Sequence, residues 1–243
     1  MQALILAGGL GTRLRSAVPD RPKVLAEVEG RPFLEYVVRL LVEHGITDLI
    51  FCIGHLGQMV RDHFSDGRAV GATIRYSVET EPLGTAGAVR QASPMIDGAF
   101  WVINGDSYVE LDYEAMAGFH ARRRRDDPQS LGTIAARQVE DASRYGRLEL
   151  TEAGRISFFR EKSEPGPGMI NAGVYLLEPA VLEMIPPARA VSIEKETFPK
   201  AIQSGARLYA LATKGYFMDI GTPESFELAE AFIGRNFASL TTT

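Results

Sequence analysis

Short apolar runs alternate with longer amphipathic segments along most of this chain. The apolar runs predict strands at residues 3–6, 48–53, 73–77, 100–103, 132–136, 172–177 and 208–211. The amphipathic segments predict helices at residues 33–43, 58–64, 85–91, 113–124, 193–203 and 224–233. Strands that alternate with helices are typical of βαβ units, so the pattern predicts an α/β fold with a largely parallel sheet.

The segment at residues 147–160 has a different pattern. Leu148, Leu150, Ile156 and Phe158 alternate with polar residues on both sides of a turn at residues 152–154. A period of two around a turn that contains glycine predicts a β-hairpin. Residues 164–168 contain two prolines and two glycines and are expected to form a loop.

Composition supports a folded chain with one core. The 243 residues are 45% hydrophobic and 23% charged, without a repeat, a linker or a low-complexity segment. We therefore expect a single domain over residues 1–243. In a parallel sheet, ligands bind at the carboxyl ends of the strands, so candidate chemistry is sought there.

Charge and cysteine content exclude some classes of function. The formal net charge is −5, whereas general nucleic-acid binding needs a basic face. The arginines at residues 122–125 end a predicted helix and are followed by two aspartates, so we interpret them as a solvated helix end. Cys52 lies in an apolar run and is expected in the core. Without a long apolar run or a basic leader, we expect a cytoplasmic protein that does not bind a membrane.

A glycine-rich loop follows the first predicted strand. The string GGLGTRL occupies residues 8–14, and Pro22 and Lys23 come soon after. Glycines let backbone N–H groups approach a phosphate, and Arg13 and Lys23 add cations. The loop lacks the third glycine of a dinucleotide fingerprint and the lysine pattern of a P-loop, which disfavours a simple Rossmann-type binding module. A glycine pair alone would suggest a structural turn, but the combination predicts phosphate binding.

Two acidic residues are candidate metal ligands. Asp106 follows the predicted strand at residues 100–103, where a carboxylate can hold Mg²⁺ against phosphates. The alternative for this segment is a simple Asn-Gly-Asp turn. Asp219 lies among apolar residues just before a helix start, and by itself it could be a satisfied buried carboxylate.

Residues 8–14 with Pro22 and Lys23 resemble the signature of the sugar-1-phosphate nucleotidyltransferases, also called nucleotide-sugar pyrophosphorylases. The resemblance extends from Met1 to about Gly234. It implies a Rossmann-like three-layer α/β/α fold with a mixed, mainly parallel sheet. It also implies a reaction in which a nucleoside triphosphate and a sugar 1-phosphate give a nucleoside-diphosphate sugar and pyrophosphate. Longer relatives carry a C-terminal β-helix, for which these residues leave no room.

The resemblance also implies roles for individual residues. Asp106 and Asp219 would bind Mg²⁺, Arg13 would stabilise the triphosphate and the departing pyrophosphate, and Lys23 and Lys162 would handle the reacting phosphates. The implied nucleotide-binding residues are Leu6, Ala7, Gly8, Gly9, Gly11, Thr12, Arg13, Glu79, Pro82, Gly84, Thr85 and Asn104. The implied sugar-phosphate-binding residues are Gly146, Glu161, Lys162 and Asn171.

Two of these sugar-binding positions carry a specific expectation. Gly146 would offer backbone where a side chain would collide with the hexose. In Glu161-Lys162, the glutamate would take sugar hydroxyls and the lysine would take the phosphate. Relatives usually have proline after this lysine, whereas this chain has Ser163.

Residues 79–87 match the family's base-recognition segment and indicate the nucleotide. Uridylyl and thymidylyl relatives commonly have glutamine where Glu79 stands. A carboxylate only accepts hydrogen bonds, which suits the adjacent N1–H and amine donors of guanine. The residue types therefore favour GTP, with Glu81 as the alternative reader if the loop is shifted.

The choice of sugar stays open between related guanylyltransferases. Residues 31–36 and 104–108 resemble heptose-1-phosphate guanylyltransferases, whereas residues 191–196 resemble mannose-1-phosphate guanylyltransferases. We favour GDP-D-glycero-α-D-manno-heptose as the product. The alternatives are a mannose-1-phosphate guanylyltransferase, a uridylyl- or thymidylyltransferase, and a non-catalytic sensor subunit. A homodimer is compatible with this assignment.

Overall fold

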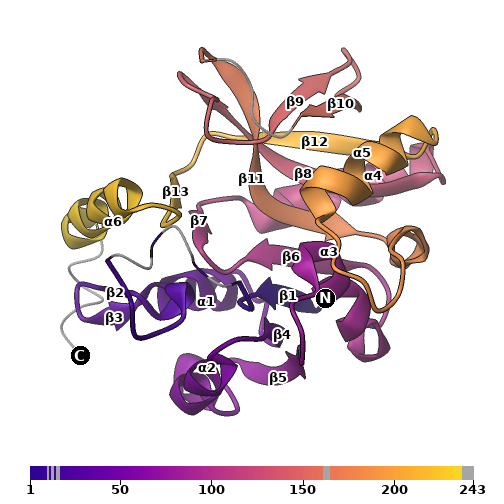
Figure 1. Ribbon diagram of the computed structural model, residues 1–243. Coiled ribbons are helices and arrows are strands. Elements are labelled where there is room, and N and C mark those ends of the chain that lie inside the picture. The colour runs from indigo at the N-terminus through magenta and orange to yellow at the C-terminus, as the bar shows by residue number, and fades with distance from the viewer. Residues whose placement is uncertain (10, 12–13, 15–16, 161–164, 237–243) are drawn as a thin grey trace.

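The computed structural model describes the chain except residues 10, 12–13, 15–16, 161–164 and 237–243 (Figure 1). Its centre is a nine-stranded mixed sheet. The parallel part has the order β6, β1, β4, β5, formed by β6 (Phe100–Asn104), β1 (Ala3–Leu6), β4 (Asp48–Ile53) and β5 (Thr73–Val78). The carboxyl ends of these strands therefore lie along one edge of the sheet.

A long antiparallel strand, β11 (Gly168–Leu177), joins this part to the rest of the sheet. Its C-terminal half pairs with β6, and it also pairs with β8 (Ser130–Val139), which in turn pairs in parallel with β12 (Arg207–Thr213). At Ile170 it pairs with β9 (Arg147–Leu150), the partner of β10 (Ile156–Arg160). One strand therefore connects the parallel strands to the hairpin.

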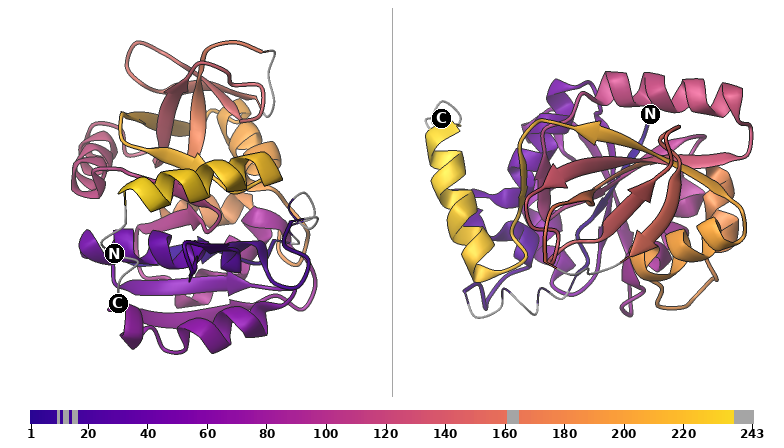
Figure 2. Two further views of the ribbon diagram at one scale, coloured as in Figure 1. Left: turned by 90° about the vertical axis from the view of Figure 1, so that its left-hand side faces the viewer. Right: turned by 90° about the horizontal axis from the view of Figure 1, so that it is seen from above.

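Helices cover both faces of the sheet, which makes three layers (Figure 2). Ala3 and Ile5 pack in one apolar cluster with side chains of α1 (Phe33–Glu43), α2 (Gly57–Phe64) and α4 (Tyr113–Asp126). Leu4 points to the opposite cluster, with side chains of α3 (Gly84–Ala92) and α5 (Phe198–Gln203). This alternation along one buried strand confirms the predicted α/β/α fold with its mixed, mainly parallel sheet.

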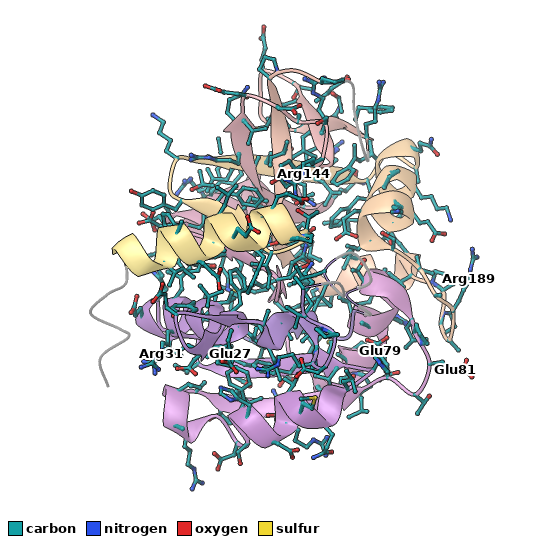
Figure 3. All side chains as sticks on the ribbon, turned by 60° about the vertical axis from the view of Figure 1, so that its left-hand side comes forward. Glu27, Arg31, Glu79, Glu81, Arg144 and Arg189 are labelled. Carbon is teal, nitrogen blue, oxygen red and sulfur yellow. The ribbon has the colours of Figure 1, made fainter. Side chains whose placement is uncertain are left out.

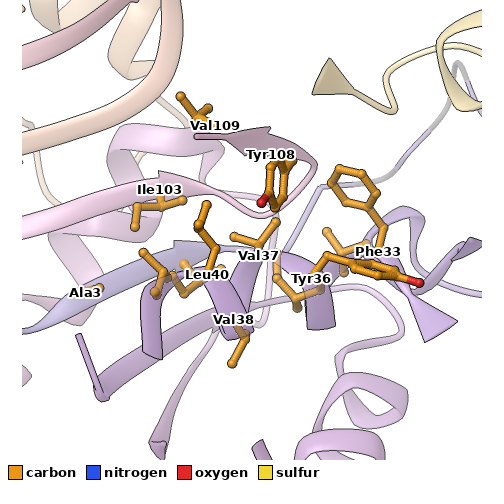
Figure 4. Close-up of a cluster of buried hydrophobic side chains, with 14 of the residues drawn as sticks. Ala3, Phe33, Tyr36, Val37, Val38, Leu40, Ile103, Tyr108 and Val109 are labelled. Carbon is orange, nitrogen blue, oxygen red and sulfur yellow. The ribbon is translucent and has the colours of Figure 1, made fainter. Parts of the chain in front are cut away.

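The first helix shows how the sequence pattern produces this packing. Val37 and Leu40 of α1 lie beside Ile103 of β6 and Tyr108 in a fully apolar contact (Figure 4). The helix ends at a glycine as its position predicts: Gly45 has a φ of +73°, and its N–H donates to the carbonyl oxygen of Val42 at 2.9 Å.

Several short elements escape the sequence pattern because they are too short to show a period. Two minor sheets join β7 (Ser107–Val109) to β13 (Phe217–Asp219) and β2 (Glu27–Val28) to β3 (Arg31–Pro32). Helix α6 (Pro223–Asn236), which the sequence pattern does predict, follows β13. The 3₁₀ segments are Lys23–Leu25, Arg68–Val70, Ser93–Met95 and Pro179–Met184.

One predicted helix is wrong in its first part. Residues 193–203 are not one α-helix, because Ile193–Thr197 form a π-helical turn that precedes α5. The side chain of Ser192 accepts a hydrogen bond from the Lys195 N–H at the start of this turn. Such single π turns are frequent at functional sites.

The hairpin is confirmed, but the alternation from which it was predicted does not continue to Phe158. The pairing of β10 with β9 shifts between Ile156 and Phe158, as in a β-bulge. The shift turns Phe159 inward, where it is 5% exposed and packs against Phe198, and leaves Phe158 44% exposed. A simple alternation therefore fails after the bulge.

The arginine run makes internal contacts on α4. The guanidinium of Arg123 lies over the rings of Phe119 and Tyr209, and Arg124 Nε pairs with Glu178 Oε1 at 3.2 Å. These contacts fit the interpretation of the run as a helix end. Among the described residues, no helix is both long and apolar enough to cross a membrane.

The inward position of Phe159 after the bulge can be tested through the free energy of unfolding. Phe159→Ala should lower the free energy of unfolding by about 3–5 kcal/mol, because it empties a buried aromatic site. The neighbouring Phe158→Ala should change it by less than about 1 kcal/mol, since that ring is largely exposed. Urea unfolding of both variants measures the difference, and equal losses would contradict the bulged pairing.

Candidate active site

The carboxyl ends of β1, β4 and β6 open into a cleft of about 430 Å³, which we call the glycine cleft. Two glycine-bearing loops form its walls, one after β1 and one before α3. Its lining consists of Leu6, Gly8, Gly9, Gly11, Lys23, Val24, Cys52, Glu79, Pro82, Gly84, Thr85, Ala88, Asn104, Asp106 and Gly221.

A second hollow of about 230 Å³, here called the aspartate pocket, adjoins the glycine cleft. Lys23, Asn104, Asp106 and Gly221 line both, so the two are contiguous. The other lining residues are Ser107, Arg144, Tyr145, Gly146, Asn171, Ala172, Gly173, Ser192, Glu194, Lys195, Phe217 and Asp219. Ligands bound in the two hollows would meet at Lys23 and Asp106.

Most described candidates from the sequence line these hollows. Ala7 is the exception in the nucleotide set: it is buried, and its N–H donates to the carbonyl oxygen of Cys52 at 2.9 Å. Gly146 and Asn171 both line the aspartate pocket. Thr12, Arg13, Glu161, Lys162 and Ser163 lie outside the described residues.

The two aspartates come together through a pair of strands that the sequence did not predict. Strand β13 pairs with β7 so that Asp219 lies opposite Ser107, next to Asp106 in sequence. The Ile220 N–H donates to the backbone oxygen of Asp106 at 3.0 Å. This short ladder fixes both carboxylates in one pocket, although 112 residues lie between them.

Each aspartate is held by neighbouring donors. Asp219 Oδ2 accepts from the Tyr145 hydroxyl, and its Oδ1 accepts from the Gly221 N–H, both at 2.8 Å. Asp106 Oδ2 forms an ion pair with Lys23 Nζ. Burial, with the nearby Asp219 charge, raises the pKa of Tyr145 well above its usual value, so its hydroxyl stays protonated and donates.

The donor chemistry of the aspartate pocket fits Mg²⁺ held jointly by protein and substrate. Among the residues that the structure describes, no three His, Cys, Asp or Glu side chains converge as a metal site. Mg²⁺ usually takes one or two carboxylates and completes its shell with phosphates and water. Asp106 and Asp219 supply such a pair, and Lys23 balances part of their charge.

Glu79 lines the glycine cleft but not the aspartate pocket. Its Oε2 accepts from the Leu83 N–H at 2.9 Å, and desolvation raises the pKa of its carboxyl. A Cβ at Gly8 would lie 2.7 Å from Glu79 Oε1, so a larger residue there would displace this carboxyl oxygen. Glu81, the alternative reader, is exposed and does not line the cleft (Figure 3).

The loop before α3 is hydrogen-bonded to the segment before the π-helical turn, beside Glu79. Gly84 has a φ of +68°, and a Cβ there would lie 2.5 Å from the carbonyl oxygen of Val191. The Ala86 N–H donates to this oxygen at 2.9 Å, and the Val191 N–H donates to the Leu83 carbonyl oxygen at 2.8 Å. The π-helical turn is thereby fixed against the start of α3.

Sequence reasoning assigned no role to several residues of the aspartate pocket. Arg144 and Lys195 bring cations to it, and Glu194 brings a carboxylate (Figure 3 labels Arg144). The resemblance of residues 191–196 to one family was the available signal for Glu194 and Lys195. Arg144 stands two residues before Gly146, which the family resemblance had assigned to the sugar site.

Two expectations about small residues can be compared with the structure. A Cβ at Gly146 would lie 3.1 Å from the ring of Phe159, so packing against β10 favours glycine whatever the pocket holds. Cys52 is buried, and desolvation raises the pKa of its thiol far above the usual value. A neutral buried thiol is a core residue rather than a nucleophile.

Two curated proteins are similar to this chain over most of its length. The mannose-1-phosphate guanyltransferase beta-A of Xenopus laevis is 38% identical over 232 residues, or 93% of this chain and 62% of that protein. This chain thus spans less than two thirds of that relative's length. The D-glycero-alpha-D-manno-heptose 1-phosphate guanylyltransferase of Campylobacter jejuni is 32% identical over 226 residues, or 93% of this chain and 97% of that protein.

A solved structure shows the same architecture. HddC from Yersinia pseudotuberculosis aligns with a TM-score of 0.83 and 33% identity, covering 96% of this chain and 99% of HddC. Its complex with GMP-PN aligns with a TM-score of 0.82. The family model described as nucleotidyl transferase matches residues 2–236. A match over almost the whole length shows that this chain belongs to the nucleotidyl transferase family.

Proposed function

We propose that this protein transfers a guanylyl group from GTP to a sugar 1-phosphate, releasing pyrophosphate. The observation that carries the proposal is the contiguity of the two hollows. The Glu79 carboxylate lines the glycine cleft alone, whereas Lys23 and Asp106 line both hollows. Two relatives are named as guanylyltransferases, and the complex of HddC with GMP-PN supports the choice of guanine.

The chemistry requires positioning more than proton transfer. A sugar phosphate oxygen, already anionic near neutral pH, attacks the α-phosphorus of GTP. The new O–P bond forms as the bond from the α-phosphorus to the β-phosphate oxygen breaks, and pyrophosphate leaves. This reaction needs no general base and no covalent enzyme intermediate. Catalysis then consists of alignment and neutralisation of charge.

The described residues divide this task by their place in the site. Glu79 accepts from the guanine N1–H and amine, and backbone N–H groups near Gly8, Gly9 and Gly11 face the phosphates. Lys23, oriented by its ion pair with Asp106, neutralises the reacting phosphates. When bound by Asp106 and Asp219, Mg²⁺ supplies further charge neutralisation there. Arg13 and Lys162 keep the phosphate roles that the family resemblance implies.

The heptose 1-phosphate is our first choice of acceptor. The Campylobacter jejuni relative named for this heptose matches along 97% of its length. Mannose 1-phosphate is the second candidate, because the Xenopus laevis relative is named for it and is more similar in sequence. The sugars share the manno configuration, so the same pocket can accept either one.

A substrate screen tests the proposed function directly. Pyrophosphate release should be fastest with GTP and D-glycero-α-D-manno-heptose 1-phosphate, slower with mannose 1-phosphate, and slow with glucose 1-phosphate, UTP or dTTP. A preference for UTP or dTTP would overturn the guanine assignment. Release from no pair would favour the non-catalytic sensor subunit.

Removal of one metal-binding charge should nearly abolish turnover. Asp106→Asn and Asp219→Asn should each lower kcat roughly a hundredfold or more, because both carboxylates hold the cation that stabilises the transition state. Titration with Mg²⁺ should show a higher requirement in both variants. Asp62→Asn, the same change at an exposed position of α2, is the control and should behave as wild type. A folded Asp106→Asn enzyme with wild-type turnover would refute the metal assignment.

Glu79→Gln should reverse the hydrogen-bonding character of the base site. The Leu83 N–H will hold the amide oxygen, so the amide N–H₂ will face the guanine donors. A mismatched buried hydrogen bond costs about 1–3 kcal/mol, so kcat/KM for GTP should fall roughly ten- to a hundredfold. For UTP it should fall less or rise.

The matched control for this substitution is Glu81→Gln, which makes the same chemical change two residues along the chain. It should leave the ratio of kcat/KM for GTP and UTP as in wild type, because Glu81 is exposed outside the cleft. If Glu81→Gln shifts this ratio and Glu79→Gln does not, then Glu81 reads the base.

A further inference from the structure

A chain of hydrogen bonds joins the glycine cleft to the aspartate pocket. Thr85 lines the cleft, and its hydroxyl donates to Glu194 Oε2 at 2.8 Å. The Tyr175 hydroxyl donates to Glu194 Oε1 at 3.2 Å. Asn171, which lines the pocket, donates from Nδ2 to the Tyr175 hydroxyl at 2.8 Å. The four side chains come from α3, the π-helical turn and β11.

The direction of each hydrogen bond is fixed by a backbone group at either end. The Ile193 N–H donates to Thr85 Oγ1 at 2.8 Å, so the hydroxyl hydrogen of Thr85 is free to turn toward Glu194. The Gly173 N–H donates to Asn171 Oδ1 at 3.0 Å, so the amide nitrogen of Asn171 faces Tyr175. Both ends of the chain therefore donate toward its centre.

The Glu194 carboxylate at the centre of this series of hydrogen bonds accepts hydrogen bonds and donates none. The Glu194 carboxylate takes hydroxyl donors from Thr85, Tyr175 and Ser192, the last at 3.0 Å. Tyr175 is fully buried, and desolvation with the nearby Glu194 charge raises its pKa well above the usual value. Tyr175 stays protonated and must donate to the carboxylate, which leaves its oxygen to accept from Asn171.

We infer that Glu194 is a positioning residue for the sugar, which acts through Tyr175 on Asn171 and is itself held by Thr85. The inference rests on the proposed function and deepens it. Asn171 has a second hydrogen on Nδ2, and the chain orients this amide as a donor toward the sugar. Thr85 lines the glycine cleft, but its hydroxyl accepts from the Ile193 N–H and donates to Glu194. This hydroxyl therefore contributes to sugar recognition rather than to nucleotide recognition.

Tyr175→Phe is the principal test because it removes one hydroxyl and keeps the ring. The ring packs edge-on against Phe198, with centroids 5.1 Å apart, and phenylalanine retains this contact. The KM for the sugar 1-phosphate should rise roughly tenfold, as expected for one lost buried hydrogen bond. We expect kcat to stay within about twofold, and the Kd for GTP measured without sugar to stay unchanged.

A matched control makes the same change elsewhere. The Tyr209 hydroxyl donates to Asp127 Oδ2 at 2.9 Å, and Tyr209 lines neither hollow. Tyr209→Phe therefore also removes a tyrosine–carboxylate hydrogen bond, but it should leave the KM for both substrates as in wild type. A merely structural effect of losing such a bond would appear in both variants.

Substitutions at Thr85 test the hydrogen bond from Thr85 to Glu194. Thr85→Val keeps the shape and removes the hydroxyl, so it should raise the KM for the sugar 1-phosphate more than the KM for GTP. Thr85→Ser keeps the hydroxyl and should restore the wild-type sugar KM. Thr85 and Tyr175 both act through Glu194. Thr85→Val should therefore raise the KM for the sugar 1-phosphate by a smaller factor in the Tyr175→Phe enzyme than in the wild type.

Several results would overturn the inference. One is a Tyr175→Phe enzyme whose sugar KM equals that of Tyr209→Phe. Another is a Thr85→Val enzyme that changes only the KM for GTP. If Thr85→Val does not fold, Tyr175→Phe alone decides.

Calorimetry of sugar 1-phosphate binding to the same variants separates this inference from the proposed function. It uses the heptose and mannose compounds and needs no turnover. A wild type that binds the sugar phosphate but releases no pyrophosphate would refute the proposed function alone. A wild type that binds neither compound would refute both.

Discussion

The architecture depends on one strand, β11, that exchanges neighbours along its length. Its C-terminal half pairs with β6 of the parallel sheet, and at Ile170 it pairs with β9 of the hairpin. The pairing with β8 shifts between Asn171 and Tyr175, where Gly173 has a φ of +79°. A Cβ at Gly173 would lie 2.8 Å from Asn104 Nδ2, so only glycine allows β11 to pass this close to the end of β6. The aspartate pocket lies at this crossing.

The charges in the site suit the proposed transfer between phosphates. The protein as a whole is acidic, and the pocket itself contains Asp106, Asp219 and Glu194. Lys23 pairs with Asp106, while the other two carboxylates accept hydrogen bonds from tyrosine hydroxyls. The charge of Glu194 is thus stabilised by neutral hydroxyl donors, and Glu194 orients the side chains that carry them. Asp106 and Asp219 keep the oxygen atoms that suit a hard cation.

The glycine cleft and the aspartate pocket share more than a boundary. The loop before α3 and the π-helical turn are joined by backbone hydrogen bonds at Val191 and by the Thr85–Glu194 contact. The two loops are therefore held to each other by short, directed hydrogen bonds. This arrangement gives a physical reason for a π turn where a regular α-helix was expected, since the turn aims Glu194 into the pocket.

The sequence by itself determined the long elements and the kind of chemistry. The helical period of α1 and the continuous apolar runs of β1, β4 and β6 are strong because these elements are buried on one face or on both, and the glycine loop with Lys23 indicated phosphate. Local pattern could not locate β7 and β13, because three-residue strands have no measurable period and are stabilised by each other. Nor could it place Phe159 inward, since a bulge reverses the alternation. The convergence of Asp106 with Asp219 was decided only by the tertiary structure, because the pairing of β7 with β13 brings them together. The link from Thr85 to Asn171 through Glu194 and Tyr175 was also decided there, because it joins α3, the π-helical turn and β11, which are distant in sequence.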